Sequence, residues 1–247
     1  MDDAALLRYS RQILLPQFGY DGQERLVAAR VLVLGLGGLG SAVALYLAAA
    51  GVGQLLLVDD DRVDRTNLQR QIAHTEADVG RLKVDSAAAR LRALNPLVNV
   101  EPLAQRLDGA ALDALAGQVD VLVDGCDNFA TRFAVNAASL ARGTPLVSGS
   151  AIRWQGQVCV FRPGTPDASC YHCLYPDIEE VAEACAHTGV LAPLVGVIGA
   201  VQALQTLKLL AGLDAPGGRL LSYDALQGRW RQARLRRDPA CPACGGR

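Results

Sequence analysis

A glycine-rich turn between an apolar strand and a helical stretch constrains the fold of this chain more than any other feature. Residues 31–34 are aliphatic, residues 35–40 read Gly-Leu-Gly-Gly-Leu-Gly, and residues 41–50 continue as a helical stretch. Gly35, Gly37 and Gly40 let the backbone approach an anionic group at the start of the helix, where unpaired N–H groups point outward. Asp59 ends the next apolar run, where a carboxylate can accept hydrogen bonds from ribose hydroxyls. The pattern predicts a nucleotide site, and NAD satisfies it as well as ATP does.

Apolar strands and helical stretches alternate along the first part of the chain. Strands are expected at 31–34, 55–58, 98–102, 119–124 and 145–148, with helices at 41–50, 80–94, 110–116 and 130–141. This alternation is typical of a parallel sheet covered on both faces. Later segments at 155–161, 219–223 and 229–235 alternate polar with apolar residues, as half-exposed antiparallel strands do. The predicted fold is α/β: a Rossmann-like, doubly wound, mainly parallel sheet extended by antiparallel strands.

The segment at 162–192 contains Pro and Cys and shows neither strand nor helix periodicity. A connection of this length inside a compact domain is typical of a lid or a crossover loop. An apolar helix is expected to follow at 193–210. The longest stretch without a polar or charged side chain, at 189–201, is shorter than the ~18 residues of a membrane span. We therefore expect a buried helix rather than a membrane anchor.

Charge and the first residues of the chain narrow the expected partners and location. Lys and Arg number 24 against 25 Asp and Glu, for a formal net charge of -1, so the composition predicts neither nucleic acid nor an anionic membrane as the main partner. The opening residues are acidic and lack the apolar core of a signal peptide. A cytoplasmic location is expected.

Cysteine usage predicts a metal site. The chain has 7 cysteines, an odd number that argues against a disulfide framework in a cytosolic protein. Two C-x-x-C pairs are separated by residues 174–240 and together offer the four thiolates of a tetrahedral Zn²⁺ site: Cys170, Cys173, Cys241 and Cys244. A redox motif needs only one such pair. Zinc bound here would hold the C-terminal segment against the loop that follows the antiparallel strand expected at 155–161.

Side-chain cations distinguish a triphosphate site from a dinucleotide site. A triphosphate under attack needs cations to hold the developing charge, whereas backbone amides hold most of a dinucleotide's diphosphate. Arg70 and Lys83, with Asn67 and Gln71 nearby and Arg11 further away, could supply this environment. Arg70 and Lys83 could equally be solvated charges on helix surfaces. Spacing alone leaves both interpretations open.

Two further residues, Asp127 and Cys185, have two interpretations each. Asp127 follows an apolar strand and could hold Mg²⁺ against nucleotide phosphates, or it could cap the next helix, a role equally open to Asn128. Cys185 lies in a polar loop two residues before a histidine, and it could be a nucleophile or an inert thiol.

Several of these stretches together resemble one protein family. The matching segments are Arg-Tyr-Ser-Arg-Gln at 8–12, the glycine turn at 35–40, residues 67–71, 80–83, 126–128 and 189–193, and both C-x-x-C pairs. In this combination the chain resembles the MoeB/ThiF (HesA/MoeB/ThiF) family, bacterial relatives of the ubiquitin-activating enzymes. The resemblance covers nearly the whole chain. The molybdopterin-synthase adenylyltransferase branch is the most similar, and the thiamine branch is next.

The resemblance implies an ATP-dependent adenylyltransferase. In this family the C-terminal glycine carboxylate of a small ubiquitin-like sulfur-carrier protein ending in Gly-Gly is activated as an acyl-adenylate, with release of pyrophosphate. A MoaD-type carrier for molybdenum cofactor biosynthesis is the main expectation, and a ThiS-type carrier for thiamine is the alternative. The whole chain, 1–247, would be one adenylation domain. It would comprise an N-terminal helical arm at 1–30, a nucleotide-binding half at 31–150, and an extension with the crossover loop and zinc site at 151–247.

The resemblance also assigns roles to residues of this sequence. The nucleotide would contact Gly38, Asp59, Asn67, Arg70, Gln71, Lys83, Asp127 and Asn128. Asp127 would hold Mg²⁺, and Arg11 would reach the partner subunit's site in a homodimer that binds two carriers as a heterotetramer. Cys185 aligns with a loop cysteine that some relatives use for thioester or persulfide chemistry. The sequence ends three residues after Cys244, so a separate sulfur donor protein is expected.

Two other functions compete with this one. An NAD-dependent oxidoreductase would rest on the glycine turn and Asp59 alone, and the sequence lacks the pattern of a second βαβαβ half. A non-catalytic scaffold that docks a carrier would have no physical need for the cations.

Overall fold

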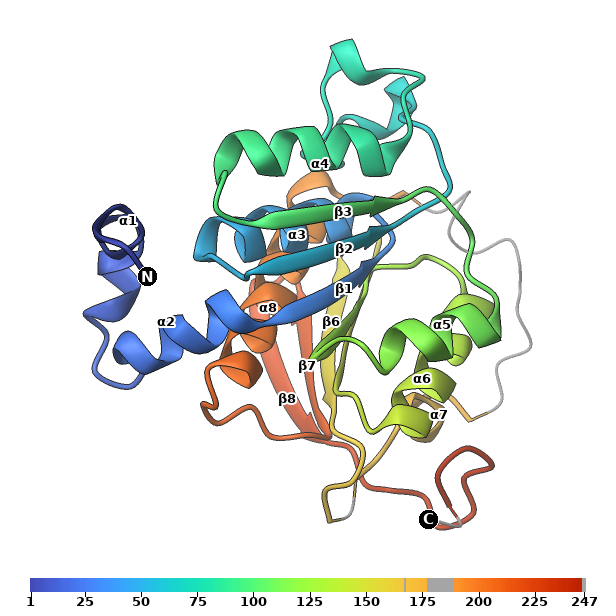
Figure 1. Cartoon of the computed structure of the whole chain (residues 1–247). Helices are drawn as coiled ribbons and strands as arrows, with labels where there is room; N and C mark the ends of the chain where they lie inside the picture. The colour runs from blue at the N-terminus through green and yellow to red at the C-terminus, as the bar shows by residue number, and fades with distance from the viewer. Residues whose placement is uncertain (167, 177–188, 246–247) are drawn as a thin grey trace.

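The computed structural model describes residues 1–166, 168–176 and 189–245. Its centre is an eight-stranded sheet in the order β3-β2-β1-β4-β5-β6-β7-β8 (Figure 1). Five strands run parallel: β1 (Arg30–Leu34), β2 (Gln54–Val58), β3 (Asn99–Leu103), β4 (Val121–Asp124) and β5 (Leu146–Ile152). Three antiparallel strands extend the sheet: β6 (Gln155–Phe161), β7 (Arg219–Asp224) and β8 (Arg229–Arg234). The predicted fold class is confirmed.

Helices cover both faces of the parallel part. Side chains alternate along each strand, so Val31 and Val33 of β1 join one apolar cluster while Leu32 and Leu34 join the other. The first cluster packs under α2 (Gly19–Ala28), α3 (Gly38–Ala50), α4 (Lys83–Leu94) and α8 (Ala192–Leu210). The second packs under α5 (Gly109–Ala116), α6 (Phe129–Arg142) and the short α7 (Tyr171–Leu174). The helix α1 (Asp3–Ile13) and the 3-10 turns η1 (Arg65–Asn67) and η2 (Glu76–Asp78) complete the described elements.

The helix α8 is a core helix, as predicted. Its 19 residues are long and apolar enough to cross a membrane by length and composition. In the fold, however, Leu194 and Ile198 are buried in the same cluster as β1 and α3. A Cβ at Gly199 would lie 2.6 Å from the Leu39 carbonyl oxygen of α3, so these two helices approach closely at this glycine. The buried apolar side chains of α8 thus pack against the sheet and α3, whereas Leu204 on the same helix is 54% exposed.

Several elements differ from the sequence-based expectation. The helix α3 begins at Gly38 rather than at residue 41, and β4 begins at Val121 rather than at residue 119. Three further differences have a visible cause or change the type of element. The helix expected from residue 80 begins at Lys83, because Gly80 has a φ of 86° and Leu82 bridges to Arg62 before the helix starts. The strand β5 continues to Ile152 because β6 pairs with it along its whole length, down to Ile152 opposite Gln155. A helical turn, α7, lies inside the segment that was expected to be a loop.

The strand order places a switch point between β1 and β4. From β1 the chain moves outward to β2 and β3, and it then crosses back to β4 on the other side of β1. In open α/β sheets the helices on the two sides of such a point diverge, and a crevice forms beyond the carboxyl ends of the strands. The site described next lies there.

Candidate active site

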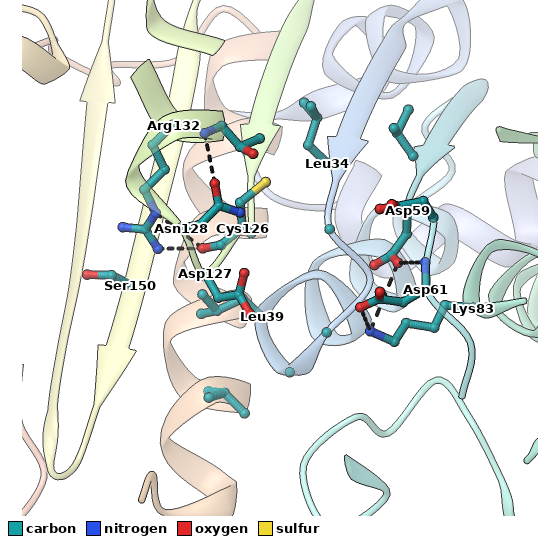
Figure 2. Close-up of a pocket in the computed structure, with 18 of the residues that line it drawn as sticks. Leu34, Leu39, Asp59, Asp61, Lys83, Cys126, Asp127, Asn128, Arg132 and Ser150 are labelled. Carbon is teal, nitrogen blue, oxygen red and sulfur yellow. Dashed lines mark hydrogen bonds and ion pairs between the residues drawn. The ribbon is translucent and has the colours of Figure 1, made fainter. Parts of the chain in front are cut away.

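A cavity of about 790 Å³ opens at the carboxyl ends of β1, β2 and β4 (Figure 2). Its lining includes eight of the residues that the sequence analysis assigned to nucleotide binding: Gly38, Asp59, Asn67, Arg70, Gln71, Lys83, Asp127 and Asn128. These residues come from five separate segments of the chain. The fold therefore brings together side chains whose proximity the sequence could only imply.

The glycines of the turn after β1 have different structural reasons. Gly35 has a φ of 80°, and a Cβ at Gly40 would lie 1.7 Å from the Gly35 carbonyl oxygen, so both are required for the turn itself. A Cβ at Gly38 would lie 2.7 Å from Cγ2 of Val195, so this glycine makes room for α8. At Gly37 the nearest atom to a Cβ would be the Gln71 side-chain nitrogen at 3.7 Å. The start of α3 is therefore open toward the cavity at Gly37.

The Leu36 peptide unit in this turn is held at both of its polar atoms. Its N–H donates to Oδ2 of Asp59 at 2.7 Å, and its carbonyl oxygen lies 3.1 Å from Nε2 of His74. A carbonyl only accepts, so Nε2 carries the proton, and Nδ1 accepts from the Ser86 hydroxyl at 2.9 Å. Burial lowers the pKa of His74 and favours this neutral form. The sequence analysis did not identify His74, because its partners lie on other segments.

Lys83 is a buried cation rather than a solvated surface charge. Its side chain is 7% exposed, and Nζ lies 2.7 Å from Oδ2 of Asp61 and 4.0 Å from Oδ1 of Asp59. Lys83 is also the first residue of α4, where the helix dipole disfavours a positive charge. Helix stability therefore does not account for a lysine here, whereas an anionic ligand in the cavity would.

Polar side chains from the segment around η1 lie beside Lys83. Nη2 of Arg70 donates to Oδ1 of Asn67 at 2.8 Å, which orients the guanidinium. The side-chain oxygen of Gln71 is buried and has no hydrogen-bond partner among the described residues. An oriented guanidinium and an amide that can still bond are suited to a polar ligand.

On the opposite wall, the structure distinguishes Asp127 from Asn128. Oδ1 of Asn128 accepts from the Thr131 N–H at 2.9 Å, so Asn128 caps α6. Asp127 is exposed, and its carboxylate makes no hydrogen bond or ion pair with another described residue. Figure 2 shows it across the cavity from Lys83. The helix-cap alternative thus applies to Asn128, and Asp127 remains available to a cation.

The wall beside Asp127 contains a buried network that sequence reasoning missed. Arg132 of α6 lies against the buried Asp124. Its guanidinium donates to the Cys126 carbonyl (Figure 2). Burial raises the pKa of the Cys126 thiol well above its usual value, and the pKa of the buried Cys159 thiol to about 12. These cysteines are therefore protonated near neutral pH and are not nucleophiles.

The remaining part of the lining is apolar and comes partly from a loop. Leu34 and Val58 end their strands, and Leu107 with Leu112 closes this side from the β3–α5 connection and α5. An apolar pocket beside polar groups can accept a planar base while the polar groups orient the rest of the ligand. Leu107 has no periodic signal in the sequence, because it lies in an irregular loop.

Arg11 lies outside this cavity. It is an exposed residue of α1, and α1 contacts the far end of α3, where Nε2 of Gln12 donates to the Ala50 carbonyl at 3.1 Å. The glycine turn is at the other end of α3, about 20 Å away at 1.5 Å per residue. Figure 1 shows α1 on the side of the sheet opposite the strand arrowheads. Arg11 therefore does not contribute to the cavity of its own chain.

The two C-x-x-C pairs meet although they are far apart in sequence. Sγ of Cys170 lies 3.9 Å from Sγ of Cys173 and 3.7 Å from Sγ of Cys241. Sγ of Cys173 lies 3.5 Å from Sγ of Cys244. Zn–S bonds of about 2.3 Å in a tetrahedron require S–S separations of about 3.8 Å. The four thiols therefore fit a tetrahedral zinc ion. Cys185 lies outside the described residues.

Comparison with known proteins identifies the family. The model of the ThiF family matches residues 9–243. The chain belongs to the ThiF family. This assignment agrees with the resemblance found from the sequence motifs.

Curated ThiF relatives match this chain over nearly its full length. The sulfur carrier protein ThiS adenylyltransferase of Escherichia coli is 47% identical over 100% of this chain and 98% of its own. The molybdopterin-synthase adenylyltransferase of the same organism is also 47% identical, over 99% of this chain and 98% of its own. Identity therefore does not separate the two branches.

Solved structures support the same fold. Escherichia coli MccB, crystallised with ATP, superposes with a TM-score of 0.82 at 25% identity, over 96% of this chain and 73% of that chain. The superposition covers 96% of this chain, so the shared fold includes the antiparallel part of the sheet. Among the described strands, those that follow β5 are antiparallel, which does not match the second parallel half expected of an NAD-dependent oxidoreductase.

Proposed function

We propose that this ThiF-family protein is an ATP-dependent adenylyltransferase. It activates the C-terminal glycine carboxylate of a small ubiquitin-like sulfur-carrier protein as an acyl-adenylate and releases pyrophosphate. The observation that carries the proposal is the cavity itself, where the buried cation of Lys83 and the free carboxylate of Asp127 face each other beyond the open start of α3. Full-length relatives at 47% identity that are named adenylyltransferases support it. The whole chain acts as one adenylation domain.

ATP fits the cavity in one direction. The apolar side at Leu107 and Leu112 receives the base, and the Asp59 carboxylate accepts from the ribose hydroxyls. A carboxylate has about four acceptor sites, and the Leu36 and Asp61 N–H groups use two of those on Asp59. The phosphates then lie at the N-terminus of α3, where the backbone N–H groups and the helix dipole favour an anion.

Side chains around the phosphates supply charge and positioning. Arg70 and Lys83 contact phosphate oxygens, with Asn67 and Gln71 beside them. Exposed carboxylate oxygens are the ligands that Mg²⁺ prefers, so the free Asp127 fits that ion. Bound there, Mg²⁺ would neutralise phosphate charge.

The reaction is a displacement at the α-phosphorus. A carboxylate oxygen of the carrier's terminal glycine forms a bond to this phosphorus, and the bond from the phosphorus to the oxygen bridging the α- and β-phosphates breaks. Pyrophosphate leaves with the electron pair. Negative charge grows on the leaving group, and preorganised cations stabilise that charge more in the transition state than in the ground state. Lys83 and Arg70 supply this stabilisation.

Arg11 acts in the cavity of a second subunit. Its position beyond the far end of α3 rules out its own cavity and leaves it exposed for another chain. A homodimer in which each Arg11 reaches the partner subunit's site would complete the cation set, and with two carriers it forms a heterotetramer. An arginine supplied by a second subunit stabilises the negative charge of the transition state, as arginines supplied in trans do in phosphoryl transfer.

Zinc has a structural role in this proposal. Four thiolates leave no open coordination position, which is typical of structural rather than catalytic zinc. Figure 1 shows the C-terminal end of the chain beside α7, the two segments that the cysteines join. We also propose a cytoplasmic location and a separate sulfur donor protein, with Cys185 as a candidate for thioester or persulfide chemistry.

The carrier could be of either type represented among the relatives. A MoaD-type carrier, for molybdenum cofactor biosynthesis, is our first choice, on the motif resemblance. A ThiS-type carrier is the alternative, because the ThiS adenylyltransferase matches equally well.

Intact-mass analysis of the carrier tests the proposed activity. After incubation with ATP, Mg²⁺ and this protein, a Gly-Gly carrier should gain the mass of one adenylyl group, which is AMP less one water, and pyrophosphate should appear in equal amount. A carrier that lacks its terminal glycine is the matched control and should remain unmodified. Unmodified carriers of both types, together with tight ATP binding, would leave a non-catalytic scaffold as the better account.

A further inference from the structure

Arg132 is a buried cation that no step of the proposed reaction uses. It lies in the first turns of α6 and is 8% exposed. Its guanidinium donates to the Cys126 carbonyl from Nε at 3.2 Å and from Nη2 at 2.5 Å. Nη2 also donates to the Gly149 carbonyl at 3.1 Å, and Nη1 donates to the Tyr171 hydroxyl at 3.3 Å. Four contacts to protein oxygens occupy most of its donors, so Arg132 holds protein rather than ligand.

These contacts fix the peptide units that precede Asp127. Asp124 is 1% exposed, and its Oδ1 accepts from the Cys126 N–H at 2.9 Å. The Cys126 carbonyl, whose carbon is bonded to the Asp127 nitrogen, is held by Arg132. Nε of Arg132 lies 3.9 Å from Oδ2 of Asp124. Because the two buried charges are opposite, each compensates for the burial of the other. Asp124 and Arg132 thus hold both backbone polar groups of Cys126, the residue directly before Asp127.

At its other end Arg132 reaches the cysteine site. Tyr171 is 1% exposed and stands directly after Cys170, in the first C-x-x-C pair. Its ring packs edge-on against Phe133 of α6 at 5.5 Å, and its backbone N–H donates to Oδ1 of Asn136 at 2.9 Å. The Tyr171 hydroxyl is thus held rigidly only while the segment that carries the cysteines stays docked on α6.

We propose that Arg132 is a positioning residue through which the four-cysteine site sets the orientation of Asp127. Zinc in that site keeps Tyr171 docked, Tyr171 orients the Arg132 guanidinium, and Arg132 holds the Cys126 carbonyl. Zinc binding therefore raises the affinity of the distant cavity for the magnesium complex of ATP. The inference rests on the magnesium role of Asp127 proposed above.

Nucleotide binding with and without Mg²⁺ isolates this effect. The dissociation constant for ATP is measured by calorimetry on the zinc-loaded protein, first with Mg²⁺ and then in buffer free of divalent ions. Arg132→Lys keeps the charge but not the fork of donors, and we expect it to weaken binding of the magnesium complex about tenfold. Tyr171→Phe removes only the hydroxyl, and we expect about a threefold loss. Binding without Mg²⁺ should change by less than about twofold in both variants.

Ser139→Ala is the matched control. It removes a buried hydrogen bond on the same helix, from the Ser139 hydroxyl to the Thr144 carbonyl at 2.6 Å, without touching Tyr171 or Cys126. If the effect of Arg132→Lys is purely structural, Ser139→Ala should cause a similar loss of ATP affinity. In that case each variant should lose the same affinity with Mg²⁺ as without it. Tyr171→Phe preserves the aromatic packing, so it tests the proposal even if Arg132→Lys folds poorly.

Zinc removal completes the test, with zinc content measured by mass spectrometry. In the wild type, removing zinc should weaken binding of the magnesium complex by about the same factor as Tyr171→Phe, about threefold, and in Tyr171→Phe or Arg132→Lys it should add little, because zinc acts through the contact between Tyr171 and Arg132. Independent, multiplying losses would overturn the proposal.

Asp127→Asn separates the two failures. If it abolishes the Mg²⁺-dependent part of the affinity while Arg132→Lys and Tyr171→Phe bind like the wild type, the positioning role is wrong and the magnesium assignment stands. If Asp127→Asn keeps that dependence, the magnesium assignment is wrong and this inference falls with it.

Discussion

Replacing Lys83 by Met should strongly reduce activity without destabilising the fold. Methionine matches the length of the lysine stem and removes the ammonium group, with its charge and its hydrogen bond to Asp61. The ion pair with Asp61 contributes at most about 1 kcal/mol, because the Asp61 side chain is 69% exposed and solvent screens the pair. Removing a positive charge from the start of α4 should raise the free energy of unfolding by about 0.3–1 kcal/mol, because the helix dipole disfavours a positive charge there.

The two effects on stability nearly cancel. Asp59 lies further from Nζ, at 4.0 Å, and keeps its two backbone N–H donors at 2.7 and 2.9 Å. Its carboxylate is therefore not left without partners when the lysine is removed. The free energy of unfolding of Lys83→Met should lie within about 1 kcal/mol of the wild type.

The effect on activity should be far larger. Loss of one preorganised group that stabilises developing charge lowers rates by about 10²–10³-fold. We expect a loss of this size in kcat/KM for ATP–pyrophosphate exchange. Arg81→Met is the matched control, because Arg81 pairs with Asp78 at 2.5 Å, is 49% exposed and lies outside the cavity lining. Exchange by Lys83→Met within about threefold of the wild type would refute the phosphate role of Lys83.

The remaining predictions concern Asp127, the buried His74, the glycine turn and the zinc site. Asp127→Asn should fold normally and lose carrier-dependent exchange, measured by incorporation of labelled pyrophosphate into ATP. The pKa of His74 is lowered in the fold, so unfolding takes up a proton below pH 6.5 and stability should fall as the pH drops through this range; His74→Gln should flatten the dependence in urea titrations from pH 7 to 5. Gly40→Ala places a Cβ 1.7 Å from a carbonyl oxygen and should destabilise the fold by about 3 kcal/mol, whereas wild-type stability would show that the turn can move. Cys244→Ser should lower bound zinc and reduce the Tm by about 5 °C, and an unchanged metal content would contradict a four-thiolate site.

Much of the fold was predictable, because its signals are local. Each parallel strand is a short aliphatic run, and each covering helix lies between two such runs, so the pattern alone predicts the order and type of these elements. The limits of the elements were less predictable. The strand β5 runs to Ile152 only because β6 pairs with it, and α4 begins at Lys83 only because Leu82 bridges to Arg62. These limits depend on neighbours that the sequence does not identify.

The candidate site was predictable where its residues belong to motifs. The structure brings Asp59, Lys83 and Asp127 to one cavity, while their roles there stay predictions. His74 and Arg132 were not found, because each acts on backbone carbonyls of distant segments. A buried histidine or arginine has no sequence pattern when its partners are main-chain atoms.

Carrier-dependent ATP–pyrophosphate exchange tests the central claim most directly. The purified protein is incubated with ATP, labelled pyrophosphate and Mg²⁺, and with MoaD-type or ThiS-type carriers from the same genome, one at a time. The account predicts that label enters ATP only when one Gly-Gly carrier is present, and that the carrier without its terminal glycine is inert. Exchange with neither carrier, by a protein that binds ATP and zinc, would contradict the proposed activity.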